Sequence, residues 1–95
     1  MNLGRVVGPL VASRKEPLME GMKFLVVRGI GADNSDSDSY VVAVDAVGAG
    51  AGEVVMYASG SSARQTALTK DRPCDAVIMA IVDTWEVDGE TVYVK

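Results

Sequence analysis

The chain has 95 residues, a formal net charge of −4, and a composition that is 48% hydrophobic but only 5% aromatic. This acidic balance disfavours nucleic acid and anionic membranes as partners, because both are bound through clustered Lys and Arg side chains. The absence of histidine excludes Ser-His-Asp catalysis and most zinc sites. The longest apolar run, residues 76–82, is far shorter than the roughly 20 residues that span a bilayer. With no signal-peptide pattern in residues 1–20, we expect a cytoplasmic protein.

The size of the chain predicts one domain over residues 1–95. A domain this small buries somewhat over ~60% of its unfolded surface, so its stability is modest without a supplement. A disulfide cannot be that supplement, because Cys74 has no second cysteine to pair with, and this favours a reducing compartment. The high aliphatic content therefore predicts an oligomer that buries the excess apolar surface.

The first half of the chain predicts three strands. Residues 3–12 are rich in Val and Leu and should bend at Gly4 and Gly8, with Pro9 at an edge, bulge or bend. Residues 23–28 alternate weakly as a second strand. Residues 31–39 form an acidic, turn-forming connection, and residues 40–45 predict a third strand that is apolar on both faces.

The second half contains a glycine-alternating loop, one short helix and a hairpin. Gly48, Gly50 and Gly52 suit a tight passage of the backbone, and residues 53–57 follow as a fourth strand. Ser61 or Ser62 is expected to cap a short helix over residues 63–68. Residues 75–85 predict a fifth strand. The pair at positions 88 and 89, Asp-Gly, predicts a turn that returns residues 91–94 onto that strand, which completes a small all-β barrel.

Two catalytic or ligand-binding interpretations are weak. A serine-lysine pair of Ser61 or Ser62 with Lys70 is not enforced by the spacing, and serines in this position are ordinarily helix caps. The loop of residues 48–52 could cradle a phosphate, but it lacks the Lys-Ser/Thr of a P-loop and the strand-loop-helix order of a dinucleotide fold. A structural role is favoured for both segments.

Two further features have competing interpretations. Asn34, Asp36, Asp38 and Asp45 faintly resemble the spacing of a calcium loop, but Ser39 stands where that loop requires glycine, so a solvated acidic loop is favoured. Arg64 could bridge a carboxylate across a subunit interface or could be an exposed charge on a helix, and the sequence favours neither.

The organising segment, residues 44–66, also carries a family resemblance. The run VDAVGAGAGEVV followed by GSSARQT resembles the EutN/CcmL family of bacterial microcompartment shell vertex proteins. The segments GRVVG at residues 4–8, VASRK at 11–15, DAVI at 75–78 and IVD at 81–83 extend the similarity to residues 2–83. Ala80, where the family pattern has glycine, the acidic segment 31–39 and the tail 84–95 depart from the pattern.

The resemblance implies an OB-like, five-stranded β-barrel with one short α-helix, to which this chain adds a C-terminal hairpin extension. It implies a non-catalytic homopentamer at the vertices of a microcompartment shell, beside hexameric and pseudohexameric shell proteins, with no cofactor and no metal. Subunit contacts or a pore are expected near six residues: Gly48, Gly50, Gly52, Ser61, Ser62 and Arg64. The alternative function is an OB-like module that binds an oligonucleotide or a small ligand.

Overall fold

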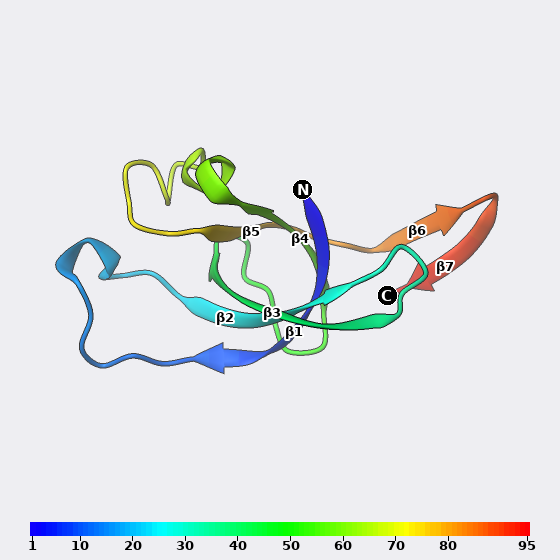
Figure 1. Ribbon diagram of the computed structural model, residues 1–95, viewed down its shortest axis with the longest axis horizontal. Coiled ribbons are helices and arrows are strands. Elements are labelled where there is room, and N and C mark those ends of the chain that lie inside the picture. The colour runs from blue at the N-terminus through cyan, green and yellow to red at the C-terminus, as the bar shows by residue number, and fades with distance from the viewer.

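The computed structural model describes residues 1–95. Seven strands and two 3-10 helices follow one another along the chain: β1 (Asn2–Leu10), η1 (Pro17–Met19), β2 (Phe24–Ile30), β3 (Asp36–Asp45), β4 (Val54–Ser59), η2 (Gly60–Arg64), β5 (Ala76–Ile81), β6 (Thr84–Val87) and β7 (Glu90–Val94). The first five strands close a barrel in the order β1-β2-β3-β5-β4, and β6 and β7 form a separate two-stranded sheet (Figure 1). The expected all-β, five-stranded barrel with a C-terminal hairpin is confirmed.

Barrel closure depends on one parallel pairing. All other neighbouring strands run antiparallel, whereas β3 and β5 pair parallel through Val44 with Val77 and Asp45 with Ile78. On β1 a register shift between Val6 and Gly8 marks a bulge next to Pro9, where the sequence predicted an edge, bulge or bend. β1 pairs with β4 through residues 2–5 and with β2 through residues 4–10.

Buried apolar side chains form two clusters, one inside the barrel and one on the outer face of its strands. The cluster inside the barrel consists of Val6, Leu25, Val27, Ala43, Ala49, Val55, Ala76 and Ile78. The outer cluster lies between the strands and the segment around η2, and it consists of Met22, Phe24, Val44, Ala58, Ala63, Cys74 and Val77. Both faces of β3 are therefore covered at Ala43 and Val44, as its two-sided apolar pattern predicts.

The helix differs from its expected form. The sequence predicted a short α-helix over residues 63–68 with Ser61 or Ser62 as its cap, whereas the structure has the 3-10 helix η2, preceded by Ser59 without a side-chain capping bond. Thr69 Oγ1 donates a hydrogen bond to the carbonyl of Ala63 at 2.6 Å and also bonds the Thr66 hydroxyl at 2.6 Å. The threonine hydroxyls bond backbone N–H and C=O groups that a longer helix would use for its own hydrogen bonds, so the helix ends here.

Two strand boundaries also differ from expectation. β3 begins at Asp36, inside the segment predicted as a loop. There Arg5 of β1 contacts the Asp36 carboxylate at 2.6 Å, and Arg28 of β2 lies 3.9 Å from the carboxylate of Asp38. The predicted fifth strand of residues 75–85 is divided into β5 and β6, which are separated by residues 82 and 83. The break lets the hairpin leave the barrel and pair with itself.

The hairpin gives the molecule its elongated shape, with extents of 46 × 23 × 22 Å. It projects from the opposite end of the barrel to the loop between β1 and β2 (Figure 1). Asp88 and Gly89 form its turn with φ of +52° and +79°, as an Asp-Gly hairpin turn requires. None of the helices has the length and apolar character needed to cross a membrane.

Candidate assembly site

A buried carboxylate holds the start of the glycine loop. Oδ1 of Asp45, at the end of β3, accepts hydrogen bonds from the backbone N–H of Val47 at 3.1 Å and of Gly48 at 3.0 Å. The Asp45 side chain is 1% exposed, and its Oδ2 lies 3.5 Å from Nζ of Lys23 without a hydrogen bond. Gly48 adopts φ of +78°, a conformation that glycine tolerates without strain.

The other end of the loop is held by Glu53. Its Oε1 accepts a hydrogen bond from Gly50 N–H at 2.6 Å, and the N–H of Gly52 donates to the carbonyl of Val6 at 2.8 Å. Oε2 of Glu53 lies 2.6 Å from Nζ of Lys95, and this contact lowers the pKa of Glu53 and raises that of Lys95. Because the three glycine amides already have acceptors within the chain, the loop does not present a free phosphate cradle.

The serines of η2 are exposed. Ser61 and Ser62 lie on the surface and make no hydrogen bond to Lys70, so the structure brings no serine-lysine pair together. Arg64 donates from Nη1 to the carbonyl of Cys74 at 3.3 Å and lies 4.0 Å from the carboxylate of Asp75. Its guanidinium therefore contacts its own subunit and remains partly exposed.

Cys74 is a free thiol buried beneath η2. Burial raises its pKa above the ordinary value of 9.0, although Arg64 partly offsets this effect. A thiol held protonated in this way is a poor nucleophile, and its hydrogen bond to the carbonyl of Ala63 places it in the packing of the outer cluster.

The six expected site residues form two groups. Gly48, Gly50 and Gly52 precede β4, whereas Ser61, Ser62 and Arg64 follow it. A strand of six residues spans about 20 Å, so the two groups lie at opposite ends of β4 and not in one cluster. Asp45, Glu53 and Lys95 hold the first group in place, and sequence analysis missed that role. The sequence does place a carboxylate on each side of the glycine loop, Asp45 before it and Glu53 after it, and this pattern could have indicated that role.

Two arginines of the barrel contact the acidic segment. Arg5 contacts Asp36 at 2.6 Å and also Asn34, while Nε of Arg28 donates to the carbonyl of Ser37 at 2.7 Å. Arg28 also lies over the ring of Tyr40, 5.4 Å from its centroid. Arg5, Arg28 and Tyr40 share one outer row of the sheet, which is a surface the alternative nucleic-acid module could use. Both guanidiniums are already paired, and this argues against that use.

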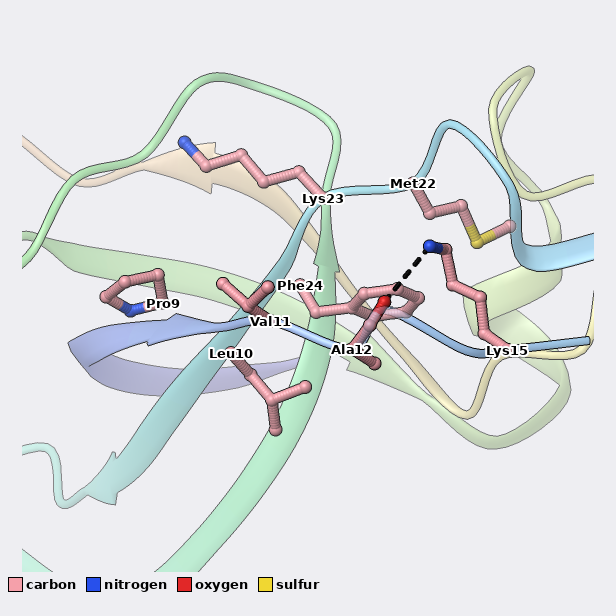
Figure 2. Close-up of a pocket in the computed structure, with 8 residues that line it drawn as sticks. All are labelled: Pro9, Leu10, Val11, Ala12, Lys15, Met22, Lys23 and Phe24. Atoms are coloured by element: carbon pink, nitrogen blue, oxygen red, sulfur yellow. Dashed lines mark hydrogen bonds between the residues drawn. The ribbon is translucent and has the colours of Figure 1, made fainter.

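A groove of about 420 Å³ lies where β1 ends and β2 begins. Figure 2 shows its eight lining residues: Pro9, Leu10, Val11, Ala12, Lys15, Met22, Lys23 and Phe24. The ammonium of Lys15 donates to the carbonyl of Ala12 at 3.1 Å. The ammonium of Lys23 is directed away from Lys15 and toward Asp45. The groove is mainly apolar and contains no pair of catalytic groups.

Comparison with known proteins identifies the fold and its relatives. The family model described as "Ethanolamine utilisation protein EutN/carboxysome" matches residues 1–83. The chain belongs to this family. The carboxysome shell vertex protein CcmL of Gloeobacter violaceus is 46% identical over all of this chain and 95% of its own length. The shell vertex protein PduN of Salmonella typhimurium is 42% identical over 88% of this chain and 97% of its own length.

Solved structures of EutN/CcmL proteins share the barrel. The structure of Gloeobacter violaceus CcmL superposes with a TM-score of 0.96, covering all of this chain and 98% of that one. GrpN of Rhodospirillum rubrum, described as a pentameric microcompartment shell protein, superposes with a TM-score of 0.84 at 41% identity and covers 92% of this chain and 99% of that one. These relatives are named for a structural role in shells and not for a reaction. The non-catalytic role implied by the sequence resemblance agrees with this finding.

Proposed function

We propose that this chain is a single-domain structural subunit that forms homopentamers and closes the vertices of a bacterial microcompartment shell. The observation that carries the proposal is the match of the whole barrel to GrpN, which is itself described as a pentameric shell protein. The vertex position follows from the CcmL and PduN relatives, both of which are named shell vertex proteins. The proposed location of this chain is therefore the shell of a bacterial microcompartment.

Vertices require neighbours, and these are proposed to be the hexameric and pseudohexameric proteins of the flat facets. A closed polyhedral shell with hexagonal tiles needs five-fold units at its corners. The support for this partner is indirect, because it comes from the vertex names of the relatives. Co-expression with hexameric tiles tests it. Closed particles should form with this chain, and unclosed sheets or tubes should form without it.

The glycine loop and η2 are proposed to lie beside subunit contacts or a central pore. Gly50 is exposed and has ordinary backbone geometry, and a Cβ there would meet only Oε1 of Glu53, at 3.4 Å. Ser62 is exposed on η2. A large side chain at either position therefore fits the isolated subunit but would obstruct a close neighbour. Such substitutions distinguish an assembly site from an ordinary surface.

Light scattering on the purified chain tests the assembly directly. The expected mass is about five times the 10.0 kDa of one subunit. Gly50→Trp and Ser62→Trp should lower this mass, whereas Lys70→Trp, at an exposed position outside both groups, should leave it unchanged. A monodisperse monomer at micromolar concentration for the unmodified chain would refute the pentamer and with it the vertex function.

A further inference from the structure

Several large apolar side chains point outward from the barrel, where they contribute nothing to its interior. A closed barrel needs only its inward residues to be apolar, because successive side chains of a strand face opposite sides. Here Val7, Val42, Met56 and Met79 are 54%, 47%, 36% and 39% exposed. They occur in two groups, one across β1, β2 and β3 and the other across β1, β4 and β5. Exposed apolar patches of this kind mark interaction surfaces.

The first group is the valine wall, defined as Val7, Gly8, Val26 and Val42. Gly8, Val26 and Val42 lie in one row across β1, β2 and β3, and Val7 adjoins Gly8 at the bulge. A Cβ built on Gly8 would have no neighbouring atom within 4 Å. The wall therefore has an open space at its centre, flanked by valine side chains.

The second group is the methionine wall, defined as Leu3, Met56, Met79 and Ala80. Leu3, Met56 and Ala80 lie in one row across β1, β4 and β5, with Met79 next to Ala80 at a register shift. Unbranched methionine side chains adapt to irregular surfaces. The β4 strand runs through this wall, so the glycine loop lies beyond one of its ends and η2 beyond the other.

The two walls are centred on different strands on either side of β1. The valine wall is centred on β2 and the methionine wall on β4, and these strands are not neighbours in the closed order β1-β2-β3-β5-β4. They are also unlike each other, since one is hollowed at glycine and the other presents flexible methionines. A ring requires such a pair of different patches, whereas a two-fold dimer needs one self-complementary patch.

We propose that the valine wall of one subunit packs against the methionine wall of the next subunit around the ring. This inference rests on the proposed pentamer, and the occupant of each wall is a second copy of this chain. A second copy is favoured because the structurally similar GrpN is described as pentameric and so must bury surface between copies. The charges nearest the valine wall are on Arg5 and Arg28, and both already have partners within the subunit. Burying the wall against a neighbour would therefore leave no unpaired positive charge in the interface.

If the walls meet in this way, the glycine loop and η2 both lie near the same subunit contact. Both flank the strand that carries Met56, so a neighbour seated on the methionine wall passes close to each end of β4. The two groups of site residues therefore do not need to touch each other. They border the same interface.

Cross-linking between engineered cysteines tests which surfaces meet. A short bismaleimide is applied to Val42→Cys, to Met79→Cys and to the double variant, with the unmodified chain as control because its Cys74 is buried. The double variant should give covalent species of up to five subunits, and each single variant should remain at one subunit. Dimers in a single variant, or no ladder in a double variant that still has the pentamer mass, would overturn the pairing of the two walls.

Substitution within the walls gives an independent measurement. Gly8→Leu has space in the isolated subunit and should retain the circular dichroism of the fold, but it should lower the mass at micromolar concentration from five subunits toward one. Val42→Glu and Met79→Glu should do the same, whereas Leu18→Glu, on η1 and 56% exposed, should stay pentameric.

These outcomes separate this inference from the proposed function. If the unmodified chain is pentameric and the three wall variants remain so, the interface lies elsewhere while the vertex function stands. Pentameric wall variants that fail to join hexameric tiles would assign the walls to that contact and also overturn this inference. A monomeric unmodified chain would instead refute the proposed function itself.

Discussion

Nζ of Lys95 lies 2.6 Å from Oε2 of Glu53, whose other oxygen accepts the N–H of Gly50. This single carboxylate joins the end of the C-terminal hairpin to the glycine loop. The pairing lowers the pKa of Glu53 below 4.5 and raises that of Lys95 above 10.5.

The Glu53 contact should make stability depend on pH in the acid range. Because the folded-state pKa of Glu53 is lowered, its contribution is present above about pH 4.5 and is lost as pH falls through the lowered pKa. Urea unfolding at fixed protein concentration should show Glu53→Gln to be less stable than the unmodified chain near neutral pH, with a smaller difference at about pH 3. Glu86→Gln on the hairpin is the control. An equal deficit at both pH values would contradict the assignment.

The pair of Glu53 and Lys95 should also make stability depend on pH in the alkaline range, where its contribution is lost as the pH rises. Since the folded-state pKa of Lys95 is raised, its contribution is present below about pH 10.5 and is lost as pH rises through the raised pKa. Lys95→Met should therefore lose its deficit relative to the unmodified chain as the pH is raised beyond that value. A deficit that persists would show that Lys95 acts through the packing of its stem.

Two glycines of β1 should respond differently to substitution by alanine. A Cβ at Gly4 would overlap Cγ1 of Val27 and approach Cε1 of Tyr57 to 2.9 Å, so Gly4→Ala should cost about 1–3 kcal/mol through overpacking. A Cβ at Gly8 meets no atom of its own subunit within 4 Å, so Gly8→Ala should change the free energy of unfolding of the subunit by less than about 0.5 kcal/mol. Chemical denaturation measures both. Similar losses at the two sites would contradict this account.

Removing the buried carboxylate should loosen the glycine loop. Asp45→Ala leaves the amides of Val47 and Gly48 without their acceptor and should cost about 1–3 kcal/mol. Asp45→Asn keeps one oxygen acceptor and should cost less. Lys23→Gln changes only an exposed partner and should cost at most about 1 kcal/mol. If Lys23→Gln equalled Asp45→Ala, the ion pair and not the amide bonds would hold the loop.

The hairpin should depend on Trp85. Its ring stacks on Tyr93 with centroids 5.0 Å apart, and its Nε1 donates to the carbonyl of Ala32 at 2.8 Å. Because an isolated two-stranded hairpin is only marginally stable, Trp85→Ala should speed amide hydrogen exchange in β6 and β7 but leave the barrel amides protected. Trp85→Phe keeps the stacking and should have a smaller effect. Faster exchange throughout β1 to β5 would show that the hairpin supports the barrel.

The acidic segment should bind no calcium stoichiometrically. Asp36 and Asp38 lie beside arginines, and Asp33 accepts hydrogen bonds from the amide and hydroxyl of Ser35, which lower its pKa. These carboxylates do not converge on one point, as a calcium site requires. Titration calorimetry should show no saturable heat, and micromolar stoichiometric binding would refute this expectation.

The sequence by itself determined the features that depend on neighbouring residues. Alternating and β-branched runs predicted the barrel strands, and Asp88-Gly89 predicted the hairpin turn, because side-chain alternation and turn conformation act over a few residues. The family motif at residues 44–66 likewise pointed to the EutN/CcmL family, to which the match over residues 1–83 assigns the chain.

Only the tertiary structure decided the features made by residues distant in the chain. The parallel pairing of β3 with β5 brings Val44 beside Val77, and no local pattern specifies that choice. Arg5 contacts Asp36 at the start of β3, although the two residues are 31 positions apart in the sequence. Likewise, Gly8 and Val42 share a surface because β2 lies between their strands, so only strand order and register could turn scattered apolar residues into two walls.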